Sequence, residues 1–314
     1  MFALRCLDVS LAFFLAVYGL LSFAVTRTWR PFARLVDRQS PRVSSNLLFG
    51  LRVSPFVLAL GVTAIFVLPS FLLLEPRSGV EPIGEMPLAL SLCCIALAAA
   101  GVYSAIRAQA RVTRAVELWL HRATPAGVMS SIPVYRIRPS VPALTVVGVR
   151  GPKVLVSDAA AALLTAQELD RALEHEIAHV RRRDNLKKLI FRFTTFPGMG
   201  ALEAKWSELG EMAADDAAVK NASDALDLAS ALIKLSRLAP CSLQALPASG
   251  ILSGSVTALN ARVERLISWQ AASAPENTAA WYVVPTALAL GAAVVISYSA
   301  LLLDLHKITE WLVR

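Results

Sequence analysis

Four long runs of apolar residues without a single charge are the feature that most constrains this chain. They cover Val9–Val25, Val53–Leu74, Leu88–Ile106 and Trp281–Leu303. A helix of about 20 apolar residues crosses the ~30 Å hydrocarbon layer of a bilayer, because each residue rises 1.5 Å. Hydrophobic residues make up 56% of the chain and charged residues 17%, which is too apolar for an ordinary soluble protein. The sequence therefore predicts a mainly α membrane protein with four transmembrane helices, and buried soluble helices are the less favoured alternative.

The first apolar run could instead be a cleaved signal peptide. Signal peptides carry positive charge before the apolar stretch and a small-residue cleavage site after it. In this chain the arginines mostly follow the run, as Arg27, Arg30, Arg34, Arg38 and Arg42. This order favours a retained anchor whose N-terminus lies outside the cell.

The positions of the basic residues predict the orientation in the plasma (inner) membrane. Residues 26–52 hold six arginines and one acid, Asp37, whereas residues 75–87 hold Arg77 and three glutamates. Positive charge stays on the cytoplasmic side, so 26–52 is expected to be a basic cytoplasmic loop. Arg107, Arg111 and Arg114 place the segment after the third span in the cytoplasm too, and alternation leaves both termini external. The net charge of +8 is thus assigned to topology and lipid head groups, and direct nucleic-acid binding is not expected.

Three regions follow from this arrangement. Residues 1–106 form a three-helix transmembrane region, 107–279 a cytoplasmic α+β domain, and 280–314 a fourth span with a short external tail. None of the four cysteines forms a CxxC pair, which argues against a disulfide framework and against a cysteine zinc site.

Within the cytoplasmic domain, local patterns predict short strands and several helices. Strands are expected at 134–137, 144–149 and 153–156, the last two joined as a hairpin by the turn Arg150-Gly151-Pro152. Thr165 and Glu168 form a capping box that begins one long helix, 166–193. After a break at 194–200, further helices are expected at 201–220, 224–238 with Ser223 as N-cap, and 257–269, while 107–122 continues the third span.

The sequence His175-Glu176-Ile177-Ala178-His179 lies inside the capped helix and carries the chemistry. Residues four apart share one helix face, so two imidazoles can bind one zinc ion at ~2.0–2.1 Å. Glu176 lies beside the first ligand, where it can act as the general base for a zinc-activated water. Two of the chain's four histidines form this motif. The alternative is a helix with incidental histidines and a salt-bridging Glu176.

A catalytic zinc site usually has three protein ligands, so a third must come from elsewhere in the chain. Glu211 is the candidate, because it lies on the next predicted helix, folded back by Pro197-Gly198. Asp215 lies one turn later on the same face, where it can orient a zinc-binding histidine. Without the histidine motif, Glu211 would be read as a solvated helix residue.

Here the chain resembles a known family. Residues 175–186, HEIAHVRRRDNL, resemble the HELxHxRRxDxL signature of the M56 zinc metallopeptidases, the family of the BlaR and MecR membrane proteases. Residues 211–215, EMAAD, resemble its downstream ExxxD segment, which is shared with the M48 peptidases (HtpX and the CAAX prenyl proteases). Residues 262–266, RVERL, resemble the RIxxL segment of both. The resemblance implies a cytoplasm-facing gluzincin-type domain with one Zn²⁺ per chain.

The resemblance also implies residue roles. His175, His179 and Glu211 would be ligands, Glu176 the base, and Asp184 and Asp215 partners of the ligands. Two departures stand out. The chain stops at Arg314, where the BlaR-type receptors continue into a sensor domain, so direct β-lactam sensing is not expected. The histidine that M48 enzymes often carry before the RIxxL arginine is missing, which leaves Arg262 as either an oxyanion stabiliser or a structural residue.

Three functions remain open on the sequence. The leading one is a regulatory membrane zinc endopeptidase that cuts a cytoplasmic or membrane protein, such as a transcriptional repressor or its own chain. The second is a quality-control protease like HtpX. The third is a zinc-binding membrane scaffold without catalysis, which Glu176 argues against, since a structural site needs no base and closes its fourth position with another Cys or His. The hairpin 144–156 could hold substrate as an added strand or be purely structural.

Overall fold

The computed structural model describes residues 2–76, 84–138, 143–149, 151–238 and 256–269, with a few single residues after 297. Three of its helices are long and apolar enough to cross a membrane. They are α1 (Phe2–Val36), the continuous helix from α2 (Pro41–Val62) through η1 (Thr63–Val67) to α3 (Leu68–Leu74), and α4 (Glu85–Leu120). For three of the expected spans, the structure therefore confirms a helix that is long and apolar enough to cross a membrane. The fourth, Trp281–Leu303, lies almost entirely outside the described residues.

The second membrane helix contains a π-helical turn, η1, whose cause is local. Pro69 has no N–H, so the carbonyl of Ile65, four residues earlier, loses its α-helical donor. The hydroxyl of Tyr298 donates to this carbonyl at 3.0 Å, and its ring contacts Phe66. A residue of the expected fourth span thus satisfies the backbone group that the proline leaves free.

Most of the segment 26–52, which the sequence analysis predicts as a basic loop between two spans, is helical. α1 continues to Val36 with Pro31 inside it, and α2 begins at Pro41, in the first turn of a helix, where the missing N–H of proline costs no helical hydrogen bond. Arg52 is not a head-group residue. It is 1% exposed, and its guanidinium donates to Glu203 and to the Thr194 carbonyl, both at 2.8 Å.

A four-stranded sheet follows α4, in the order β1-β2-β4-β3. Its strands are β1 (Thr124–Met129), β2 (Ile132–Ile137), β3 (Leu144–Val147) and β4 (Lys153–Ser157). β3 and β4 form the expected antiparallel hairpin, whereas β2 and β4 are parallel. β1 was not expected, because Pro125 and Gly127 disfavour strands. It is an exposed edge strand whose register shifts between those two residues.

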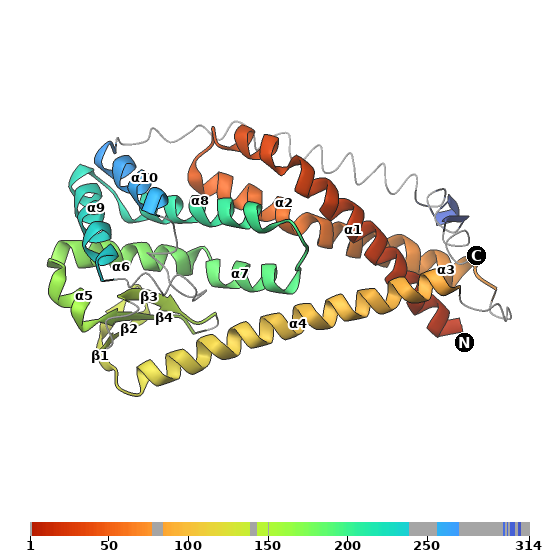
Figure 1. The fold of residues 1–314 in the computed structure, drawn as a ribbon, viewed down its shortest axis with the longest axis horizontal. Helices are drawn as coiled ribbons and strands as arrows, with labels where there is room; N and C mark the ends of the chain where they lie inside the picture. Colours follow the sequence, from red (N-terminus) through yellow and green to blue (C-terminus); the bar gives the residue numbers. More distant parts are fainter. Residues whose placement is uncertain are drawn as a thin grey trace.

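Six further helices complete the described fold (Figure 1). They are α5 (Asp158–Leu163), α6 (Ala166–Arg181), α7 (Asp184–Phe193), α8 (Gly200–Ala218), α9 (Ala222–Ser236) and α10 (Val256–Ile267). The capping box at Thr165 and Glu168 is confirmed. Two expectations are wrong. The single helix 166–193 is two helices separated at Arg183, whose φ of 55° ends the α-helical path, and Asn221 rather than Ser223 caps α9.

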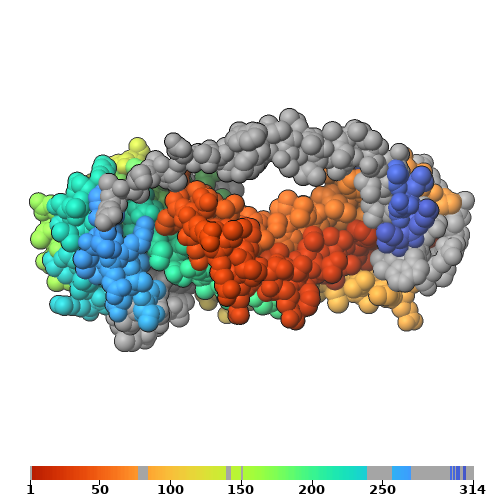
Figure 2. Space-filling model, turned by 90° about the horizontal axis from the view of Figure 1, so that it is seen from above, coloured from red at the N-terminus to blue at the C-terminus, as the bar shows by residue number. Residues whose placement is uncertain are grey.

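β3 and β4 are buried on both faces because alternate side chains enter two clusters. Val134, Val146 and Val154 pack with α6, α9 and α10, whereas Val147 and Leu155 pack against the end of α4. Figure 2 shows α9 and α10 gathered at one end of an elongated molecule, with the N-terminal helices beside them. The end of the third membrane helix therefore supports the sheet directly.

A separate hydrophobic cluster joins α7 and α8 to the first two membrane helices. Val25 and Ala33 of α1 and Leu48 of α2 pack with Phe191 of α7 and with buried residues of α8, namely Leu202, Trp206 and Leu209. The Tyr18 hydroxyl of α1 donates to the Thr194 carbonyl at 2.9 Å. The region after residue 107 is thus not a detached domain on a linker, because two of its helices pack against α1 and α2.

Glu168 at the start of α6 gives a test of stability against pH. Its buried carboxylate accepts from Lys234 Nζ at 2.7 Å and from Ser230 Oγ at 2.6 Å. Burial alone would raise its pKa, but these hydrogen bonds and the Lys234 charge outweigh burial and lower it to about 2. A carboxyl group whose pKa is lower in the folded chain stabilises the fold at pH values above its unfolded-state pKa. This stabilisation is lost as the pH falls, here from about 4.5 to about 2.

Glu168→Gln should therefore lower stability by about 2 kcal/mol at pH 7, and the difference from wild type should shrink as pH falls from about 5 towards 2. Thermal unfolding in detergent at several pH values measures this. Glu174→Gln, on the same helix but in a loose 3.7 Å pair with exposed Arg181, is the control and should change little. A destabilisation of Glu168→Gln that did not vary with pH would contradict the charge argument.

Candidate metal centre

Two packed helices bring the three predicted metal ligands together. His175 and His179 lie one turn apart on α6, and Glu211 lies on α8, which packs against α6. Ala213 and Ala214 on α8 are buried, and their small side chains allow the two helices to approach closely. One ligand atom from each of the three residues lies within 4.8 Å of the others, so this cluster could hold a metal ion.

The distances within the cluster leave room for one metal ion, and the Glu211 contacts with the two histidines use different oxygens. The two Nε2 atoms lie 3.2 Å apart, and the Glu211 oxygens lie 3.5 Å from Nε2 of His175 and 3.6 Å from Nε2 of His179. Ligands at about 2.0–2.2 Å from one tetrahedral zinc ion would be separated by roughly 3.3–3.5 Å. Two neutral imidazole nitrogens and a carboxylate form a donor set that suits zinc. The residues present therefore fit a metal ion, and the fit is to a site with three protein ligands.

Each histidine has a carboxylate at its other ring nitrogen. Asp215 Oδ1 lies 3.0 Å from Nδ1 of His175, and Asp184 Oδ2 lies 2.7 Å from Nδ1 of His179. Asp184 forms a hydrogen bond with His179 Nδ1, whereas Asp215 lies within ion-pair distance of His175 Nδ1 without hydrogen-bond geometry. A carboxylate in either place favours the proton on Nδ1 and leaves Nε2 to bind a metal. Asp184 can do this because α6 ends at Arg181, which lets the chain turn and bring the first residue of α7 back to His179.

Arg262 of α10 is engaged by the site's carboxylates. Its Nε and Nη2 donate to Asp215 at 2.8 and 2.6 Å, and its Nη1 donates to Glu211 Oε2 at 3.1 Å. Burial alone would raise the pKa of Asp215, but the charge of Arg262 lowers it to about 2. This bidentate pairing favours the structural alternative for Arg262 over an oxyanion role, since its guanidinium positions a ligand and the partner of another ligand.

The charges of the ligands stabilise one another. Burial would lower the pKa of His179, but the Glu211 carboxylate and the hydrogen bond with Asp184 raise it to about 10. Burial would likewise raise the pKa of Glu211, yet the nearby His179 holds it well below its usual value. A metal ion that binds here replaces protons on the histidines, so binding is expected to release protons.

Glu176 has one anchored and one unpartnered oxygen. The side chain is 1% exposed, and its Oε2 accepts the backbone N–H of Val146, in β3, at 2.9 Å. Oε1 is buried and has no hydrogen-bond partner among the described residues. Burial also raises the pKa of Glu176. A carboxylate that is held by one oxygen, with the other available and more basic than usual, is suited to accept a proton.

Two contributors escaped the sequence analysis. The backbone of Val146 could not be identified from side-chain patterns, because any residue supplies an N–H. Arg182 donates to Asp184 at 3.1 Å and to Ser45 Oγ of α2 at 2.8 Å, so it ties the site to a membrane helix. Arg182 lies within the run of three arginines after His179. The sequence shows that this run is basic, but not which groups the Arg182 side chain contacts.

None of the protein-family models searched matches this chain, and no curated protein matches it. The function of this chain is therefore inferred from the geometry of the site and from the sequence motifs.

Proposed function

We propose that this chain is a membrane-bound zinc metalloendopeptidase that hydrolyses peptide bonds of proteins in or beside the membrane. The observation that carries the proposal is the buried Oε1 of Glu176, which has no hydrogen-bond partner among the described residues, on the same helix as two histidines that converge with Glu211. A purely structural metal site would not need a carboxylate placed in this way. When bound, zinc would polarise the scissile carbonyl and the attacking water.

The chain's own residues would divide the remaining work. His175, His179 and Glu211 would hold the ion, while Asp215 and Asp184 orient the two imidazoles through Nδ1. Glu176 would take the proton from the attacking water at Oε1 and pass it to the leaving amine. The N–H of Val146 keeps the Glu176 carboxylate in one orientation throughout.

The position of β3 supports a mode of substrate binding. β3 is an edge strand of the sheet, and it touches α6 through the Val146–Glu176 hydrogen bond. An extended peptide that pairs with this edge would pass beside Glu176, and backbone pairing of this kind accepts many sequences. Because α7 and α8 pack on α1 and α2, the proposed substrates are membrane proteins or proteins held at the membrane surface, on the cytoplasmic side by the arginine pattern.

Removal of the metal tests this function. The full chain, purified in detergent with added phospholipid, should cleave an unfolded protein such as casein, and mass spectrometry should identify the new termini. A chelator should abolish cleavage, and zinc should restore it, because Glu176 as a base alone would not polarise the scissile carbonyl, which is the role proposed for the ion. Cleavage that survives complete removal of the metal would refute the proposal. So would a chain that holds zinc but cleaves neither casein nor extracted membrane proteins, which is the behaviour of a scaffold.

A further inference from the structure

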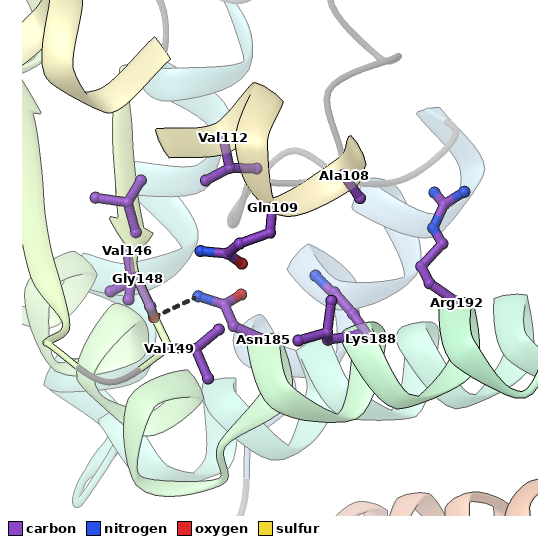
Figure 3. A pocket seen from close by; sticks show the side chains of 11 residues that line it. Ala108, Gln109, Val112, Val146, Gly148, Val149, Asn185, Lys188 and Arg192 are labelled. Carbon is purple, nitrogen blue, oxygen red and sulfur yellow. Dashed lines mark hydrogen bonds between the residues drawn. The ribbon is translucent and has the colours of Figure 1, made fainter. Parts of the chain in front are cut away.

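A pocket outside the metal centre lies between α4, α7 and the end of β3 (Figure 3). Its volume is about 60 Å³, and it is lined by side chains of α4 that include Gln109 and Val112, by the β3 end from Val146 to Val149, and by α7 from Asn185 to Arg192. By the same measure one water needs about 10–15 Å³, so the pocket has room for one small polar group but not for a large ligand.

The polar groups of the pocket are positive or neutral, with no acid among them. Lys188 and Arg192 lie one turn apart on α7, and Figure 3 shows both side chains rising towards α4. Neither side chain has a hydrogen bond or ion pair within the part of the chain that the structure describes. The Nδ2 of Asn185 donates to the Gly148 carbonyl at 3.3 Å, so the side-chain oxygen of Asn185 points away from Gly148. Two cations in one pocket, neither paired with a described residue, indicate an anionic ligand.

The position of the pocket along α4 indicates which class of anion it would bind. The apolar run of α4 ends at Ile106, and the pocket begins at Ala108. Gly101, inside that run, approaches the Phe193 carbonyl so closely that a Cβ there would clash with it. α7 therefore crosses the end of the apolar run, and the pocket lies at the level of the lipid head groups. Tyr103 and Arg107, both exposed on α4, are typical of this interface.

We propose that this pocket binds the phosphate of an anionic phospholipid through Lys188 and Arg192. The phosphate would occupy the pocket, and the acyl chains would remain outside it against the lipid-facing side chains of α4, among them Val102 and Ile106, which are 43% and 63% exposed. An acidic peptide has the same charge but no apolar tail to match that surface. The proposal does not depend on peptidase activity, although the pocket shares β3 with Glu176.

Lipid retention on the full chain tests the proposal. The chain in detergent is mixed with phosphatidylglycerol or phosphatidylcholine, and native mass spectrometry counts the lipids that stay bound. Wild type should retain phosphatidylglycerol more strongly, and each of Lys188→Gln and Arg192→Gln should weaken this by about fivefold. Lys220→Gln with Arg237→Gln is the control with the same change of charge, since both side chains are exposed beside the ends of α9 and do not line the pocket, and it should keep the preference.

A second measurement uses only the wild-type chain. Phosphatidylglycerol with a photoreactive group near its phosphate should crosslink to 108–112 or 185–192. Three results would overturn the proposal: equal retention of the two lipids, an unchanged preference in the double variant Lys188→Gln with Arg192→Gln, or crosslinks confined to other helices. Displacement of the lipid by inorganic phosphate at low concentration would point to free phosphate, and displacement by a glutamate-rich peptide would point to a protein ligand.

Discussion

Glu211→Ala is expected to lower zinc affinity by several orders of magnitude. Among the described residues three side chains could bind the ion, so removing the Glu211 carboxylate would leave two imidazoles and no donor to spare. Arg262 would lose its hydrogen bond to Glu211 but keep those to Asp215, so a counter-charge remains. Metal content should be measured by mass spectrometry after desalting, and affinity by competition with a chelator of known strength.

Glu208→Ala is the matched control for this experiment. It removes a carboxylate from the same helix, one turn earlier, where the side chain is 40% exposed and pairs with Lys205. This variant should hold as much zinc as wild type. Gel filtration and thermal unfolding should show that both variants remain folded. Full zinc occupancy in folded Glu211→Ala would mean that the third ligand is another residue.

Glu176→Gln is expected to lower the rate of peptide hydrolysis by about 10²–10⁴-fold while zinc stays bound. Glutamine keeps the size of the side chain, and its carbonyl oxygen can still accept the Val146 N–H, so the local structure should persist. What it removes is the basic oxygen that has no partner in the described structure. Cleavage rates and zinc content should be measured on the same preparation.

Glu174→Gln, two residues earlier on α6 and outside the site, is the control and should keep wild-type activity. If Glu176→Gln cleaves at nearly the wild-type rate with zinc bound, Glu176 is not the base and the mechanism fails. If Glu176→Gln loses zinc as well, the loss of activity would reflect the metal, and the role of Glu176 would have to be revised to that of a ligand or a support.

Local patterns in the sequence determined a large share of the described structure. The uncharged runs predicted the three described membrane helices, because a bilayer demands length and apolarity that few soluble helices combine. The Thr165–Glu168 capping box predicted where α6 begins, and the spacing of His175 and His179 predicted that their nitrogens would converge, because both depend only on helix geometry. The hairpin of β3 and β4 followed from its turn residues, because the conformation of a turn is also set locally.

Tertiary structure decided what depends on distant segments. The break at Arg183 could not be seen in a continuous helical pattern, yet it lets Asp184 reach His179. Arg52 looked like a surface topology signal, and it became a buried partner of Glu203, 151 residues away. Arg262 carried two readings until the packing of α10 against α8 engaged it with Asp215 and Glu211. In each case the direction of a charged side chain was set by a partner far along the chain, which no local pattern encodes.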